Sequence, residues 1–134
     1  MDQMTPRAPS SPTGELGENG IVDAATAREE ALAGRLLLVD IRTPMEWQRT
    51  GVGDAAEAIS LQDPSFLQKV LDLVGEDKSK AIAVICATGN RSSWLAGEMR
   101  RLGFHNIYDV NEGMMGSFSG PGWLGRGLPT ERPA

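Results

Sequence analysis

Two short runs of consecutive apolar residues limit the fold of this chain more than any other feature of its sequence. They cover residues 36–39 and 81–85, and each is followed by a polar or reactive side chain. A continuous apolar run of this length is typical of a strand that is covered on both faces, as in a parallel sheet. Helical patterns lie between the runs, and such alternation favours right-handed crossovers and a layered α/β domain.

Five strands are expected along the chain, at residues 21–22, 36–39, 58–61, 81–85 and 107–108. They predict a five-stranded parallel sheet with helices on both faces. Asp23 is a predicted N-cap for a helix over residues 24–33, and Thr43 to Glu46 has the capping-box pattern with proline at the first helical position. Further helices are expected after Asp63, after the fourth strand and, as a short piece, near residues 112–118.

Length and composition indicate one globular domain. The chain has 134 residues, enough for a single hydrophobic core, and 40% of them are apolar. Residues 1–18 are rich in proline, serine, threonine and glycine, so we expect a disordered N-terminal tail there. Residues 19–129 then form the domain, and residues 130–134 form a C-terminal tail.

Charge and cysteine content argue against several classes of function. The net charge of −5 argues against a broad nucleic-acid footprint. No apolar run approaches the ~20 residues of a membrane helix, and the first residues lack the apolar core of a secretory signal. The single cysteine cannot form an internal disulfide, which fits a reducing cytoplasm. We therefore expect a cytoplasmic protein without nucleic-acid or membrane partners.

That cysteine, Cys86, lies where the run 81–85 turns into a helix. The four residues after it are small or tolerate unusual dihedral angles, so several N–H groups can turn inward around the sulfur: Ala87, Thr88, Gly89 and Asn90. Such a nest at the positive end of a helix dipole favours the thiolate, which is the nucleophilic form. The alternative is that Cys86 is a small buried apolar residue.

Charged residues near the same sheet edge are candidate partners of the thiol. Asp40, Cys86 and Asp109 each lie at or just past the end of an apolar run, and parallel strands would bring them to one edge. Arg91, in the first turn of a helix, could hold an anion beside the thiol or remain solvated. Asp40 could accept hydrogen bonds from the cysteine loop or fix the next turn.

Arg42 and Glu46 are spaced closely enough to form an ion pair, and the capping role of Glu46 favours a structural interpretation of that pair. No metal constellation exists, because one cysteine and one histidine cannot build the usual site. No phosphate-binding or dinucleotide glycine motif is present either. We therefore expect chemistry without a metal or cofactor.

These motifs make the chain resemble a single-domain rhodanese, of the sulfurtransferase family, over roughly residues 19–129. The residues that carry the resemblance are LLVDIR at 37–42 followed by P-x-E-W at 44–47, CATGNRS at 86–92, and the closing GW at 122–123 and GLP at 127–129. Two segments depart from the family pattern. Residues 51–56 replace a usual His-Ile-Pro-Gly-Ala, and Glu112-Gly113 replaces a frequent Gly-Gly.

The resemblance implies a cysteine that carries sulfur as a persulfide. The family's nucleophile falls on Cys86, and its supporting Asp and Arg fall on Asp40 and Arg42. Its substrate-binding loop falls on Ala87, Thr88, Gly89, Asn90, Arg91 and Ser92. The implied partners are a small sulfur-donor anion such as thiosulfate and an acceptor that is a thiol, cyanide or a protein.

Two other functions remain open at the level of the sequence. A cysteine-based phosphatase or arsenate reductase would also use a cysteine in an anion-binding loop. The motif of those enzymes has five residues between cysteine and arginine, whereas four stand between Cys86 and Arg91. A non-catalytic sulfur carrier or partner-binding module is the second alternative.

Overall fold

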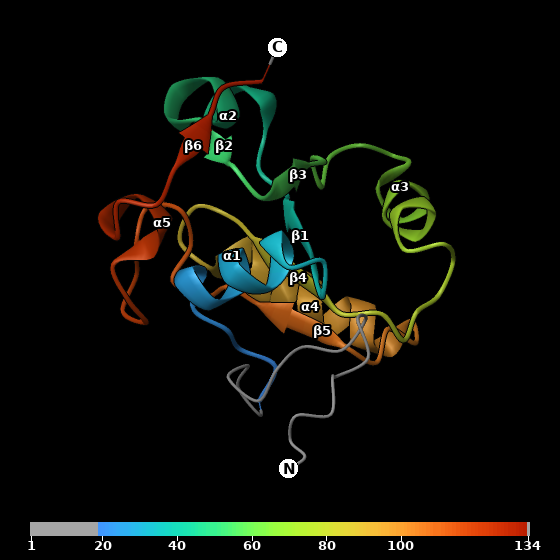
Figure 1. Ribbon diagram of the computed structural model, residues 1–134. Helices are drawn as coiled ribbons and strands as arrows, with labels where there is room; N and C mark the ends of the chain where they lie inside the picture. The colour runs from blue at the N-terminus through green and yellow to red at the C-terminus, as the bar shows by residue number, and fades with distance from the viewer. Residues whose placement is uncertain (1–18, 134) are drawn as a thin grey trace.

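The computed structural model describes residues 19–133 as a parallel sheet with helices on both faces (Figure 1). The sheet has the strand order β3-β1-β4-β5, and every pair is parallel. Its strands are β1 (Leu37–Asp40), β3 (Ala56–Ala58), β4 (Ile82–Ile85) and β5 (Ile107–Asp109). The predicted α/β class and parallel sheet are confirmed, and the N-terminal tail expected over residues 1–18 lies outside the described residues.

The parallel sheet has four strands, one fewer than the predicted five. Ile21 makes only a single parallel bridge to Asp109, at the outer edge of β5, so residues 21–22 do not form a strand. The strand expected at residues 58–61 lies two residues earlier, as β3. Because β3 is an edge strand with an exposed Glu57, its sequence lacks the continuous apolar run that marks the central strands.

Four helices cover the two faces of the sheet. α3 (Phe66–Leu73) and α4 (Asn90–Arg101) pack on one face, where Val70, Leu95 and Met99 meet Val39 and Val84. α1 (Ala24–Leu32) and α5 (Gly122–Gly125) cover the other face, where Ala27 and Trp123 meet Leu38 and Ile85. A fifth helix, α2 (Pro44–Thr50), follows β1 and begins with the predicted capping box on Thr43 and Glu46.

The chain after β5 differs from the prediction. Residues 112–118 form turns instead of a short helix, and the short helix of this region is α5. Thr130 and Glu131, placed in a tail by the sequence, form β6, which pairs antiparallel with β2 (Val52–Gly53). The sequence gives no signal for these two-residue strands, because their pairing joins distant parts of the chain.

Glu112 joins three segments through one buried carboxylate. Its oxygens accept hydrogen bonds from the backbone N–H of Ala24 at 2.6 Å and of Gly122 at 3.0 Å, the first residues of α1 and α5. Arg126 Nε lies 2.9 Å from the same carboxylate. A carboxylate at two helix N-termini satisfies donors that have no partner within their helices. The departure at Glu112 from the family's frequent glycine therefore has a structural role.

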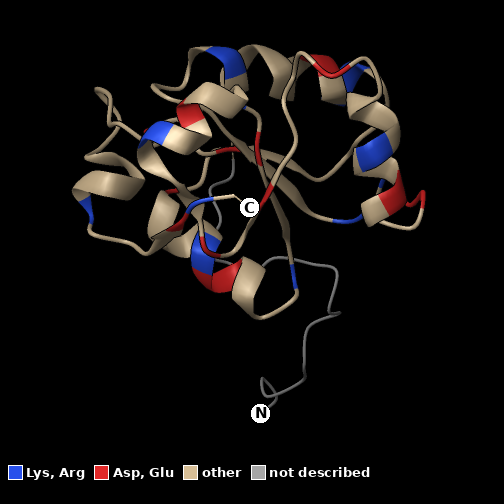
Figure 2. Cartoon of the chain, turned by 90° about the horizontal axis from the view of Figure 1, so that it is seen from above, with Lys and Arg blue, Asp and Glu red and all other residues tan. Residues whose placement is uncertain are grey.

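Acidic and basic residues are interspersed along the chain, as the coloured cartoon in Figure 2 shows. None of the helices within residues 19–133 has the length and apolarity needed to cross a membrane.

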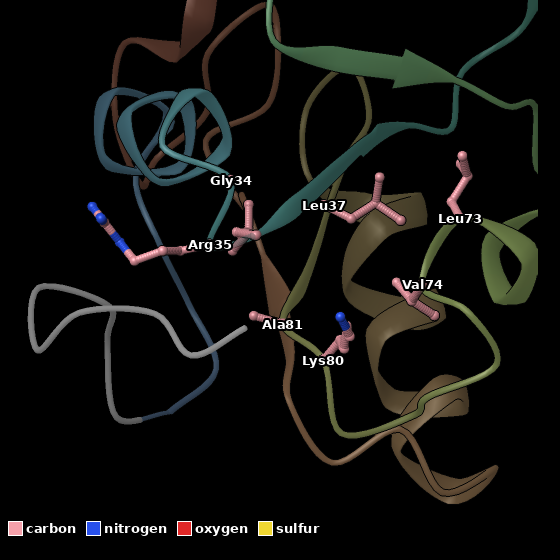
Figure 3. Close-up of a pocket in the computed structure, with 8 residues that line it drawn as sticks. Gly34, Arg35, Leu37, Leu73, Val74, Lys80 and Ala81 are labelled. Atoms are coloured by element: carbon pink, nitrogen blue, oxygen red, sulfur yellow. The ribbon is translucent and has the colours of Figure 1, made fainter. Parts of the chain in front are cut away.

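A cavity of about 270 Å³ opens at the amino ends of β1 and β4, between Leu37, Val74 and Ala81 (Figure 3). It lies at the opposite end of these strands from Cys86 and contains none of the predicted site residues.

We predict that Glu112→Ala destabilises the protein by about 2–5 kcal/mol, because it leaves two buried N–H groups and Arg126 without their acceptor. Urea unfolding followed by circular dichroism measures the change. Glu29→Ala, at an exposed position of α1, is the matched control and should unfold as the parent does. Equal stability of the two variants would contradict this role of Glu112.

Candidate active site

The carboxyl ends of β1, β4 and β5 bring the candidate residues to one edge of the sheet. Asp40 is paired with Ile85, so Cys86 begins just beyond the end of β1, and Asp109 is paired with Val84 on the other side of β4. The arrangement follows from parallel pairing, in which all strand ends of one kind meet at the same edge. The structure thus assembles the three residues that the sequence expects together.

The loop from Cys86 to Ser92 wraps around the sulfur. The backbone N–H groups of Gly89 and Ser92 donate to Cys86 Sγ at 3.2 Å and 3.3 Å. Cys86 is only 1% exposed. Gly89 caps α4 with a φ of 96°, and a side chain there would run into the carbonyl of Asn111. Two amides of the predicted loop, those of Gly89 at the N-cap and Ser92 in the first turn of α4, therefore point at the sulfur.

The segment after β5 forms backbone hydrogen bonds to this loop. The N–H groups of Met114 and Met115 donate to the carbonyls of Cys86 and Ala87, both at 2.8 Å. Gly113 has a φ of 75°, and a Cβ on it would overlap the Ala87 carbonyl. These contacts fix the backbone of the loop, so its amide directions are set before any ligand arrives.

Arg91 is held by a carboxylate from α2. Its Nη1 and Nη2 each lie 2.9 Å from an oxygen of Glu46 in a bidentate ion pair. The hydrogen bonds from Arg91, aided by those from Thr43, lower the pKa of Glu46 to about 2. The expected pair between Arg42 and Glu46 was wrong. Arg91 sits 45 residues from Glu46, and sequence spacing gives no sign of the contact.

Arg42 instead pairs with Asp40 inside the protein. The two side chains are 1% and 0% exposed, and Arg42 Nη2 lies 2.7 Å from Asp40 Oδ2. Arg42 also donates to Thr50 Oγ1 and to the Gly51 carbonyl, both at 3.0 Å. Asp40 and Arg42 thus fix the turn after β1 and the end of α2, which carries Glu46 toward Arg91.

A third polar contact lies behind the sulfur. Ser92 Oγ donates to Asp109 Oδ1 at 2.6 Å and stands 3.5 Å from Cys86 Sγ. The sequence placed Asp109 at the right edge, but nothing in it linked Asp109 to Ser92. At the outer side of the loop, Thr88, Asn90 and Phe118 line an open cavity of about 500 Å³, in which Phe118 is fully exposed.

The candidate site is built from the Cys86 sulfur, backbone amides and two arginines, Arg91 and Arg42, each paired with a carboxylate. Within residues 19–133, no cluster of three or more His, Cys, Asp or Glu side chains is placed to bind a metal ion. A thiol under converging amides with a guanidinium nearby is suited to nucleophilic attack on an anionic electrophile, since the amides stabilise negative charge on the sulfur.

Comparison with known proteins identifies the family of the chain. Residues 23–117 match the model of the rhodanese-like domain, and the chain belongs to this family. A relative from Rickettsia prowazekii, named uncharacterized protein RP600, is 30% identical over 104 residues, which are 73% of this chain and 85% of that protein. The chain therefore contains a sulfurtransferase-type domain.

Two solved structures share the fold. A rhodanese-related protein from Thermoplasma volcanium has a TM-score of 0.64 and 29% identity over 84% of this chain and 98% of its own. The polysulfide-sulfur transferase homodimer from Wolinella succinogenes has a TM-score of 0.64 and 26% identity over 85% of this chain and 79% of its own. Both similarities extend over most of the described domain.

We predict a pH-dependent contribution of the Glu46–Arg91 pair to stability. Because the pKa of Glu46 is lowered from 4.5 to about 2 in the folded protein, the pair stabilises the fold above pH 4.5 and loses this effect as the pH falls toward 2. The pair is partly exposed, so we expect Glu46→Gln to cost about 0.5–1 kcal/mol near neutral pH.

Melting temperatures of the parent and Glu46→Gln, measured from neutral to acidic pH, test this prediction. The difference should be present near neutral pH and vanish in acid. Glu57→Gln, at an exposed position on β3, is the control for loss of a carboxylate. A difference that stays constant down to acidic pH would show that the Glu46–Arg91 charge pair is not its source.

Proposed function

We propose that this protein is a sulfurtransferase that carries a sulfane sulfur as a persulfide on Cys86. The observation that carries the proposal is the pair of amides, from Gly89 and Ser92, directed at Cys86 Sγ. The same amides that favour a thiolate also favour the charged outer sulfur of a persulfide. Membership in the rhodanese-like family and similarity to a polysulfide-sulfur transferase support this chemistry.

The reaction has two displacement steps. The Cys86 thiolate attacks the outer sulfur of a donor such as thiosulfate; a bond forms between the two sulfurs, and sulfite leaves with the electron pair of the broken S–S bond. The acceptor, a thiol, cyanide or a protein thiol, then attacks the outer sulfur and Cys86 leaves as a thiolate. Covalent catalysis of this kind predicts ping-pong kinetics and requires no metal or cofactor.

Each loop residue has a proposed part in binding the donor. The backbone amides of Ala87, Thr88, Gly89, Asn90 and Ser92 form the anion-binding loop, and Arg91 adds positive charge. Asp40 and Arg42 support the site by fixing α2. Four residues between Cys86 and Arg91 give a tighter loop than the five of cysteine-based phosphatases, which suits a sulfur atom better than a phosphoryl group. We place the reaction in the cytoplasm because the chain has a single thiol.

We predict that the protein gains about 32 Da, one sulfur atom, when it is treated with thiosulfate or polysulfide, and releases it to cyanide as thiocyanate. Intact-mass spectrometry measures the first step and thiocyanate release the second. Cys86→Ser should abolish both steps with an unchanged circular dichroism spectrum, because Cys86 is the only thiol. A parent protein that takes up no sulfur from either donor would favour a non-catalytic binding module.

We also predict different effects for the two partners of the Arg91–Glu46 pair. Arg91→Ala should slow persulfide formation from thiosulfate about 10- to 100-fold, because it removes a charge-assisted hydrogen bond to the anion. Glu46→Gln leaves that cation in place and should not slow the step. Stopped-flow measurement of persulfide formation in both variants distinguishes the possibilities. If both variants formed the persulfide equally slowly, Arg91 would act only through its ion pair with Glu46, which connects α4 to α2.

A further inference from the structure

Asp109 is a buried carboxylate that the proposed sulfur transfer does not use. It is 5% exposed at the end of β5, and the side chain between it and the sulfur, Ser92, is 0% exposed. The three residues form one chain of hydrogen bonds. The Cys86 thiol donates to Ser92 Oγ at 3.5 Å, and Ser92 Oγ donates to Asp109 Oδ1 at 2.6 Å.

The number of protons shared by Cys86, Ser92 and Asp109 determines which of the three can donate and which can accept. A serine hydroxyl has one proton, and Ser92 Oγ has two acceptors within reach, Asp109 Oδ1 at 2.6 Å and the Gly89 carbonyl at 3.3 Å. The proton goes to the much closer carboxylate, so Ser92 accepts from the thiol. When Cys86 becomes a thiolate, the Ser92 hydroxyl is the O–H group beside it that can turn to donate to the sulfur, together with the Gly89 and Ser92 amides. The Asp109 carboxylate then loses its donor, which is costly for a buried charge unless Asp109 receives a proton at the same time.

We propose that Ser92 and Asp109 are positioning residues that relay the Cys86 thiol proton to the Asp109 carboxylate. The proposal rests on the proposed role of Cys86 as nucleophile. The S–H bond of Cys86 breaks as an O–H bond forms on Ser92, and the original Ser92 proton moves to Asp109 Oδ1. Negative charge passes from carboxylate to sulfur, so the buried site keeps the same net charge throughout.

The surroundings fit a carboxylate that can take up a proton. Burial raises the pKa of Asp109, while the hydrogen bond from Ser92 and the charge of Arg100, further along α4, act in the opposite direction. Other ionisable groups at this edge are Arg91 at the start of the same helix, Cys86 just after β4, and the Asp40–Arg42 ion pair at the end of β1. The thiolate that results remains held by the Gly89 and Ser92 amides.

Alkylation of Cys86 by iodoacetamide, followed by intact mass across a pH series, tests the relay. The chain has no other cysteine, and the midpoint of the rate against pH does not depend on how accessible the sulfur is. Asp109→Asn keeps the size of the side chain but cannot accept the proton. We expect its midpoint to move upward by about one pH unit, with about tenfold slower alkylation at neutral pH.

The sign of this shift separates a relay from simple electrostatics. If Asp109 were only a negative charge near sulfur, its removal would favour the thiolate, and the midpoint would move downward. An unchanged or lowered midpoint in Asp109→Asn therefore overturns the proposal. Ser92→Ala keeps its amide on the sulfur but breaks the relay, so it should shift the midpoint upward like Asp109→Asn, and the double variant should shift it no further.

Two further variants keep the test decisive. Ser92→Thr retains the hydroxyl and should keep the parent midpoint, as should the control Ser93→Ala at the exposed neighbouring position. If Asp109→Asn fails to fold, an unchanged midpoint in Ser92→Ala overturns the relay by itself. Alkylation uses no sulfur donor, so an absence of persulfide formation would overturn the proposed function without affecting this result.

Discussion

The parallel pairing of β1 with β4 is the constraint on which the rest of the molecule depends. In this pairing Leu37 lies opposite Ile82 and Asp40 opposite Ile85, with apolar side chains buried on both faces of the sheet. Burial on both faces fixes the register, because a shift of one residue would exchange the side chains of the two faces. The register in turn sets Cys86 beside the turn that begins at Asp40. Site geometry is therefore a consequence of core packing at this strand pair.

Around that edge, side chains that accept hydrogen bonds from the free N–H groups of helix N-termini also help to form the site. Glu112 accepts from the first amides of α1 and α5, and the adjacent Gly113 lies against Ala87 in the cysteine loop. Glu46 caps α2 and binds Arg91 at the start of α4. The same interactions thus stabilise the fold and fix the cysteine loop before a substrate binds, which is the condition for amides to stabilise charge without reorganising.

The chemistry of the site depends on two sets of polar groups that contact the Cys86 sulfur. The amides of Gly89 and Ser92 favour negative charge on Cys86, while the Ser92 hydroxyl and Asp109 form the proposed route for its proton. The open cavity beside Thr88 and Phe118 leaves room for a donor or acceptor on the outer side of the loop.

The sequence by itself determined the elements whose physics is local. Continuous apolar runs marked β1 and β4, and Asp23 and the Thr43–Glu46 box marked the helix starts. Chain order then placed Cys86 at a strand end before a helix. Tertiary structure alone decided the bonds from Glu46 to Arg91, from Glu112 to Ala24 and from Ser92 to Asp109, whose partners are 45, 88 and 17 residues apart. Tertiary structure also decided that Ile21 makes only a single bridge, to Asp109, and that Thr130 and Glu131 form β6. Such contacts form because packing of the core brings together segments that are far apart in the sequence. A local sequence pattern therefore cannot predict them.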